Sequence, residues 1–255
     1  MRRARTPLLG VAGAVAAVVL WALAARTWGS TALAGPGETL TAMTGLLRHG
    51  DFWSAIGTTL LMAGRGLLGA ALLGSVAGML VGSSTLLSNA VLVPLEFLKP
   101  IPPIVLLPIA ILVLGPTQVM GEALVFYGCL LPILYTTANG VRETDPVAVQ
   151  TARSFGLGRW QVLLRVTLPS TSASIGTAVR IAVPHAFAIA VLAGYLGGSP
   201  GLGREIADSV VSADTARLFG VVVVLALLGL LVHEVSHLAE RRVLHWHPTY
   251  RVRAA

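Results

Sequence analysis

Six apolar runs, each about as long as a bilayer is thick, account for most of this 255-residue chain. They cover residues 8–25, 56–81, 94–115, 120–139, 175–196 and 218–238. A helix needs about 20 apolar residues to cross the hydrocarbon core of a membrane. We therefore predict an all-α polytopic membrane protein with about six transmembrane helices, formed as a single domain over residues 1–255. The connections between runs leave no room for a soluble catalytic domain, so we expect a protein that is not itself an enzyme.

The arginines are shared unequally between the connections. Cytoplasmic loops of membrane proteins carry an excess of positive charge, and an arrangement with both termini in the cytoplasm satisfies this rule. The cytoplasmic segments then hold Arg2, Arg3, Arg5, Arg142, Arg153, Arg159, Arg165, Arg180, Arg241, Arg242, Arg251 and Arg253, whereas the external ones hold only Arg26, Arg48, Arg204 and Arg217. The net charge of +7 thus indicates anchoring at a membrane surface rather than a nucleic-acid-binding face.

The first apolar run has a second interpretation, as a signal peptide. Ala32-Leu33-Ala34 resembles a cleavage site. The apolar run is long for the core of a signal peptide, and this sequence lies well beyond its end. We therefore expect a retained first span.

The chain has no phosphate-binding loop of its own. Such a loop needs a lysine after a glycine, and the only lysine, Lys99, stands between Leu98 and Pro100. If transport is driven by ATP, the ATPase must be another polypeptide. Cys129 is the only cysteine, so the chain forms no internal disulfide.

A polar stretch, residues 141–169, separates the fourth and fifth apolar runs. Asp145-Pro146 is typical of a helix start, with a capping acceptor followed by proline at the first helical position. Gly156 and Gly158 end this short helix. A second helix, which contains Trp160, is expected to run to Leu168-Pro169, where proline marks its boundary with the next span.

This stretch resembles the EAA loop of ABC importer permeases. The usual pattern is E-A-A, a glycine four residues after the last alanine, and a distant L-P. The sequence has Gln150-Thr151-Ala152, then Gly156, then Leu168-Pro169, so the glycine and the L-P match while the glutamate and first alanine do not. The surrounding A-R-S-F-G-L-G-R-W-Q-V-L-L-R-V-T-L-P is similar to permeases of the nitrate/sulfonate/taurine type.

The resemblance implies a bacterial plasma-membrane protein with the type I importer fold and a core permease region of about 56–240. It implies a second permease subunit, most simply an identical chain, two ATPase subunits that bind ATP and Mg, and an extracytoplasmic solute-binding protein. The chain itself would bind no cofactor or metal. Contacts with the ATPase would come from Ala148, Gln150, Thr151, Ala152, Arg153, Gly156 and Arg159. Arg153 and Arg159 have two equally good interpretations: they form ion pairs with carboxylates of the ATPase, or they are solvated charges that pair with nothing.

The third run is broken by prolines, and in a membrane the freed carbonyls must face protein or water. Candidates for the pathway and its gate are Pro102, Pro103, Pro108, His185, Gly194 and Tyr195. An equally good interpretation of His185 is that it packs beside Pro184 and has no part in the pathway. Arg65 lies inside the second run, where it should face protein, a water-filled cavity or the interface. The related permeases usually carry glutamate where this chain has Gly194. The substrate therefore stays open between a small anion, a sulfonate, and a thiamine or riboflavin precursor.

Two other classes of function are consistent with parts of the sequence. His233-Glu234-Val235-Ser236-His237 fits the helical zinc-protease pattern H-E-x-x-H, with Glu240, His245 or His247 as a third ligand. Alternatively, a channel or an ion-coupled carrier would transport its solute with no ATPase.

Overall fold

The computed structural model describes residues 5–29 and 32–243, and these residues form helices and short connections without any strand. The elements in chain order are α1 (Arg5–Trp28), α2 (Pro36–Leu46), α3 (Gly50–Gly82), α4 (Thr85–Leu98), the 3-10 helix η1 (Pro103–Leu106), α5 (Leu107–Leu114), α6 (Gln118–Arg142), α7 (Pro146–Ser154), α8 (Arg159–Val162), the π turn η2 (Leu163–Thr167), α9 (Leu168–Gly197), α10 (Leu202–Val211) and α11 (Thr215–Val243).

Of the six predicted spans, four appear as long helices and a fifth as a bent pair of helices, all in the predicted order. In the described part of the chain, α3, α6, α11 and the stretch that contains α9 are each long and apolar enough to cross a membrane. The third span is not one straight helix, because α4 and the η1–α5 pair meet at 78°. The break falls at Pro100 and Pro102, where missing N–H groups prevent helical continuation. In α1, the described apolar segment Ala12–Trp28 is shorter than the others.

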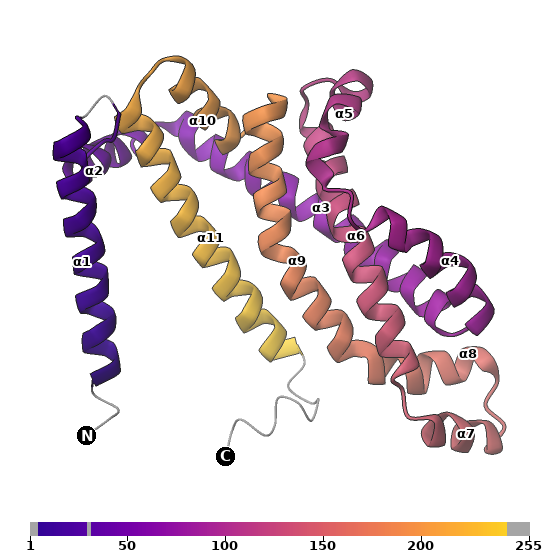
Figure 1. The fold of residues 1–255 in the computed structure, drawn as a ribbon. Coiled ribbons are helices and arrows are strands. Elements are labelled where there is room, and N and C mark those ends of the chain that lie inside the picture. The colour runs from indigo at the N-terminus through magenta and orange to yellow at the C-terminus, as the bar shows by residue number, and fades with distance from the viewer. Residues whose placement is uncertain (1–4, 30–31, 244–255) are drawn as a thin grey trace.

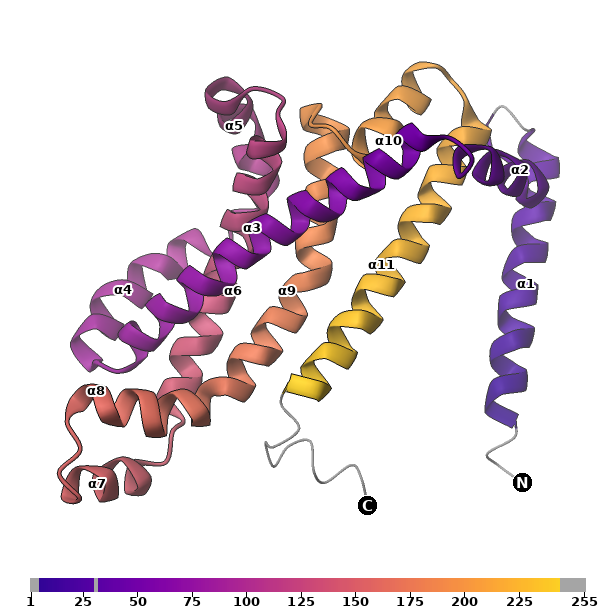
Figure 2. The same cartoon turned by 180° about the vertical axis from the view of Figure 1, so that it is seen from behind.

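The core lies where α3, α6 and α9 pack against one another. Glycines on α3 allow this packing: a Cβ on Gly66, Gly78 or Gly82 would lie 2.6–2.7 Å from a backbone carbonyl oxygen of α6. Close approach through small residues is the usual means of helix association in membranes, where lipid removes the hydrophobic drive between helices. Figure 1 shows α3 crossing behind α9 and α6, and Figure 2 shows it from the other face.

The molecule has two distinct ends. Helices α7 and α8 lie at one of them, which we call the loop end, together with the beginning of α1 and the last turn of α11 (Figure 1). Helices α2, α5 and α10 lie at the opposite end (Figure 2). At that opposite end, α1 is tied to its neighbours by Trp21, whose Nε1 donates to the Ala34 carbonyl at 3.0 Å and whose ring stacks on Phe219.

Two expected boundaries are wrong. The third apolar run begins at residue 94, but its helix, α4, already begins at Thr85, because Ser84 caps it by accepting from the Leu87 N–H. Leu168-Pro169 was expected to separate two helices, but α8 continues through η2 into α9. The π turn widens the helix just before Pro169: the Leu168 N–H bonds the carbonyl five residues back, at Leu163. This wider turn relieves the clash that a proline ring makes with the preceding turn.

Candidate functional site

Helix α7 begins where the sequence predicts. Asp145 Oδ1 accepts a hydrogen bond from the Val147 N–H at 2.8 Å, and Pro146 occupies the first turn. A cap of this kind satisfies a backbone donor that has no partner inside the helix. The predicted helix start at Asp145-Pro146 is therefore confirmed.

Helix α7 ends in a Schellman motif centred on Gly156. The Gly156 N–H bonds the Arg153 carbonyl at 2.9 Å, and the Leu157 N–H bonds the Ala152 carbonyl at 3.2 Å. Gly156 has a φ of +82°, in the left-handed region that glycine adopts readily. In this motif the glycine lies four positions after the residue whose carbonyl accepts from the N–H that follows the glycine, and this accounts for the spacing between Ala152 and Gly156.

The seven residues predicted to contact an ATPase lie on two sides of the loop. Ala148, Gln150 and Thr151 are exposed on the outer side, as is Gly156, and Ala152 is half-buried. Arg153 and Arg159 are also exposed to solvent but line a pocket on the inner side of the loop.

Two apolar side chains on the outer side were absent from the predicted set. Val147 is 65% exposed and Phe155 is 79% exposed. Helix α7 buries none of its residues against the rest of the chain. An apolar residue at each end of a polar, solvated helix was the signal that could have identified them.

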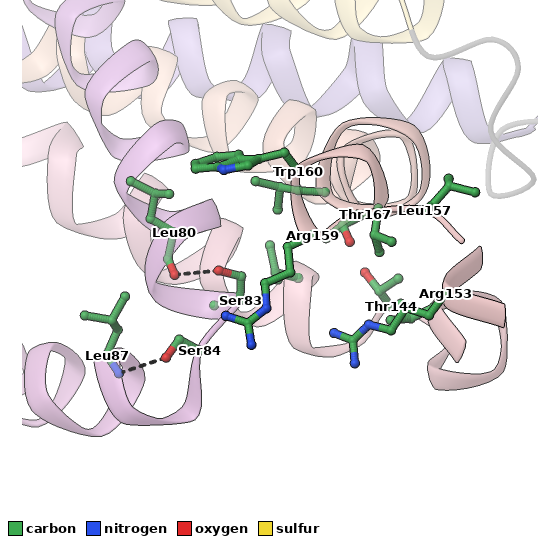
Figure 3. Close-up of a pocket in the computed structure, with 16 residues that line it drawn as sticks. Leu80, Ser83, Ser84, Leu87, Thr144, Arg153, Leu157, Arg159, Trp160 and Thr167 are labelled. Atoms are coloured by element: carbon green, nitrogen blue, oxygen red, sulfur yellow. Dashed lines mark hydrogen bonds between the residues drawn. The ribbon is translucent and has the colours of Figure 1, made fainter. Parts of the chain in front are cut away.

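The inner side of the loop encloses a pocket of about 950 Å³, which we call the loop pocket. Its walls come from the α3–α4 turn, the end of α6, and helices α7, α8 and η2 (Figure 3). It is lined by Leu80, Gly82, Ser83, Ser84, Leu87, Val141, Thr144, Val149, Arg153, Leu157, Gly158, Arg159, Trp160, Val162, Leu163 and Thr167. The α3–α4 turn and the two loop helices are therefore separated by open space instead of being packed together.

The residues predicted to line a pathway are not gathered at one place. Pro102 and Pro103 border a small apolar cavity of about 140 Å³ together with Leu124 and Ala193. Pro108 is exposed at the start of α5. His185 and Tyr195 are exposed too, and the His185 Nδ1 lies 2.9 Å from the Ile181 carbonyl oxygen of its own helix. Only the first two prolines thus approach the residues next to Gly194.

Gly194 is buried where α9 meets α10. A Cβ at this position would lie 2.9 Å from the Gly203 Cα and 3.1 Å from the Arg204 backbone nitrogen. Since both neighbours are backbone atoms, neither can rotate away. The glutamate that related permeases usually carry here is therefore incompatible with the observed contact between these helices.

We expect Gly194→Ala to lower the free energy of unfolding by about 1–3 kcal/mol, the usual cost of an overpacked site. Thermal unfolding of the detergent-solubilised permease measures this loss. Gly64→Ala is the matched control, because a Cβ on Gly64 of α3 has no atom within 4 Å. Equal stability of the two variants would contradict the tight contact.

An intramembrane polar cluster joins α3 to α6. Arg65 Nη1 lies 3.3 Å from Glu122 Oε1, which also accepts from Gln118 Nε2 at 3.0 Å. The Arg65 side chain is 61% exposed, and that of Glu122 is 22% exposed. Glu122 was not among the predicted residues, although a carboxylate inside an apolar run is itself a signal of function.

The H-E-x-x-H segment lies at the loop end of α11. His233 and Glu234 are exposed, and no group of three potential metal ligands occurs within residues 5–29 and 32–243. His245 and His247 lie outside the described residues. Glu240, the remaining candidate ligand, is buried and its Oε2 lies 2.7 Å from Arg180 Nε of α9. Nothing in this arrangement supports a zinc protease.

These features define a class: a helical membrane permease with a protruding two-helix loop at one end. The family described as "Binding-protein-dependent transport system inner membrane component" is matched over residues 70–245. The chain belongs to this family and is a permease subunit of an ABC importer, which confirms the resemblance seen in the loop sequence. Membership implies a membrane location and partnership with an ATPase and a binding protein in a transporter complex.

Similar proteins include a putative aliphatic sulfonates transport permease of Bacillus subtilis, 27% identical over 87% of this chain and 80% of its own length. A nitrate import permease of Leptolyngbya laminosa is 30% identical over 76% and 70%. A bicarbonate transport permease of Synechococcus elongatus is 30% identical over 88% and 85%. An inward-facing structure of the MetNI methionine ABC transporter has a TM-score of 0.67 at 19% identity, covering 76% of this chain and 96% of that one. This last likeness establishes the type I importer fold.

Proposed function

We propose that two copies of this chain form the translocation pathway of an importer, with the loop end in the cytoplasm and α7 docked on an ATPase subunit. Both termini then lie in the cytoplasm, in agreement with the arginine distribution. The ATPase subunits bind ATP and Mg, and a binding protein delivers solute at the opposite end.

The observation that carries this proposal is the outer face of α7. Burying an apolar side chain in a partner stabilises the complex, whereas leaving it in water has no such benefit. Val147 and Phe155 are exposed apolar side chains on a helix that has no buried residue. We assign this face, with Gln150 and Thr151 between the two apolar residues, to the ATPase contact.

The helical path from the loop suggests how force travels. Helix α8 continues through η2 into α9 without a loop between them. Movement of α7 and α8 by the ATPase therefore acts directly on α9, which packs against α3 and α6. In this mechanism ATP-driven closure of the two ATPases draws the two loops together and switches the pathway from inward-facing to outward-facing.

The exposed face of α3 supports a second permease subunit. Arg65 shares this face with Leu61, Leu68 and Leu72, each of which is more than half exposed. A guanidinium in contact with lipid is costly, so this face should meet protein or a water-filled path. We assign it to the contact or shared pathway between two identical chains.

The substrate we propose is a small oxyanion. The relatives described as permeases for aliphatic sulfonates, nitrate and bicarbonate share this chemistry. Arg65, whose guanidinium is only partly engaged by Glu122, is a cationic group of the kind such a solute needs along its path.

We expect Phe155→Ala to reduce the amount of ATPase that co-purifies with the tagged permease by about tenfold, because burial of a phenylalanine ring contributes about 1.5–3 kcal/mol. Val211→Ala is the control: Val211 is 88% exposed, but it belongs to α10 at the opposite end. Unchanged co-purification of Phe155→Ala would contradict docking through this face.

A further inference from the structure

The loop pocket contains two arginines from different helices. Arg153 comes from the last turn of α7 and Arg159 from the first residue of α8. Figure 3 shows both side chains extending into the same open space. Within residues 5–29 and 32–243, no ion pair engages either of them. Two like charges that face one cavity attract an anion, and each guanidinium can bind two oxygens of a phosphate group at once.

A hydroxyl donor lies on the opposite wall. Ser84 Oγ accepts a hydrogen bond from the Leu87 N–H, which leaves its own proton free to bond a ligand. Ser83 is already committed as a donor, because its Oγ donates to the Leu80 carbonyl at 2.8 Å. Ser84 and the two arginines therefore place hydrogen-bond donors from three separate elements around one pocket.

Apolar side chains also line the pocket. Leu80, Leu87 and Leu163 line the pocket beside the polar groups, and Trp160, which is 68% exposed, also borders it. Tryptophan is enriched at the boundary between membrane and water. Basic pockets beside transmembrane helices on the cytoplasmic side suit the head groups of anionic lipids. The same pocket thus offers basic groups for a phosphate and apolar groups for the chains attached to it.

We propose that the loop pocket binds a phosphate group between Arg153 and Arg159, supplied by an anionic phospholipid of the cytoplasmic leaflet or by free phosphate. The cytoplasmic placement rests on the proposed function. A bound phosphate joins α7 and α8 to the α3–α4 turn and neutralises the two facing charges. It therefore holds the loop helices against the membrane domain, at the point where the ATPase would act.

The test uses the purified permease alone in lipid nanodiscs, so it does not depend on ATPase docking or transport. Brominated phosphatidylglycerol and brominated phosphatidylcholine are compared as quenchers of Trp160 fluorescence. The fluorescence of Trp160 is obtained by subtracting the emission of the Trp160→Phe variant from that of the unaltered permease. We expect at least twofold stronger quenching by the anionic lipid. Arg153→Gln/Arg159→Gln should abolish this preference, and each single variant should weaken it.

The matched control is Arg165→Gln/Arg241→Gln, which removes the same charge from the loop end at two exposed arginines outside the pocket. This variant should keep the preference for the anionic lipid.

A second experiment measures binding of radioactive inorganic phosphate in detergent by equilibrium dialysis. Phosphate binding without lipid preference, lost in Arg153→Gln/Arg159→Gln, would identify free phosphate as the ligand. The proposal is overturned if the permease shows neither the lipid preference nor phosphate binding. It is also overturned if either of these persists in Arg153→Gln/Arg159→Gln.

Discussion

Replacing Gly156 with valine is expected to lower solute uptake by the assembled importer about tenfold or more while ATP hydrolysis continues. A Cβ at this position meets no atom within 4 Å, so the substitution is limited by backbone conformation and not by space. The φ of +82° costs a residue with a side chain about 1–3 kcal/mol, and β-branching adds to that cost. Relaxation to a negative φ breaks the two hydrogen bonds that end α7, which changes the angle between α7 and α8.

Gly158→Val provides the comparison for this result. Gly158 has a φ of −69°, which any residue adopts, and the nearest atom to its Cβ would be 3.9 Å away. Uptake by proteoliposomes that contain the permease, the ATPase and a binding protein should therefore be near normal for Gly158→Val. Normal uptake by Gly156→Val, or equal loss in both variants, would show that the left-handed turn is not needed for coupling.

The parts of the structure that the sequence predicted are those that depend on neighbouring residues. The cap at Asp145, the turn at Gly156 and the order of the spans each follow from a local pattern of a few residues or from one long apolar run. The interactions that stabilise these features are made between residues close together in the chain, so the sequence alone is enough to predict them. The spacing from Ala152 to Gly156 is the clearest case, since one hydrogen-bonded motif accounts for it.

The features that were missed depend on residues far apart in the chain. Pro169 was expected to interrupt a helix, but a π turn five residues long accommodates it. The partners of Arg65 and Glu240 are separated from them by 57 and 60 positions, and no local pattern pairs them. The direction of Arg153 and Arg159 was also not predictable, because it depends on where the α3–α4 turn lies.

Glu240→Ala is expected to lower the free energy of unfolding by about 1.5–3 kcal/mol, the usual contribution of hydrogen bonds to a charged group, because Glu240 is buried but the Arg180 side chain is 31% exposed. The Glu240 side chain is 4% exposed, its Oε2 lies 2.7 Å from Arg180 Nε, and its Oε1 accepts from Thr177 Oγ1 at 3.2 Å. Removal of the carboxylate leaves a guanidinium without its counter-charge between α9 and α11. Denaturant or thermal unfolding of the solubilised permease measures the loss.

Two further variants separate the ion pair from a general effect of altering α11. Glu234→Ala removes an exposed carboxylate from the same helix, and we expect it to change stability by no more than about 0.5 kcal/mol. Arg180→Met/Glu240→Leu removes both charges together and should recover most of the stability, since a well-packed apolar pair can replace a buried ion pair. If Glu240→Ala were as stable as Glu234→Ala, the pair would contribute little to holding α11 on α9.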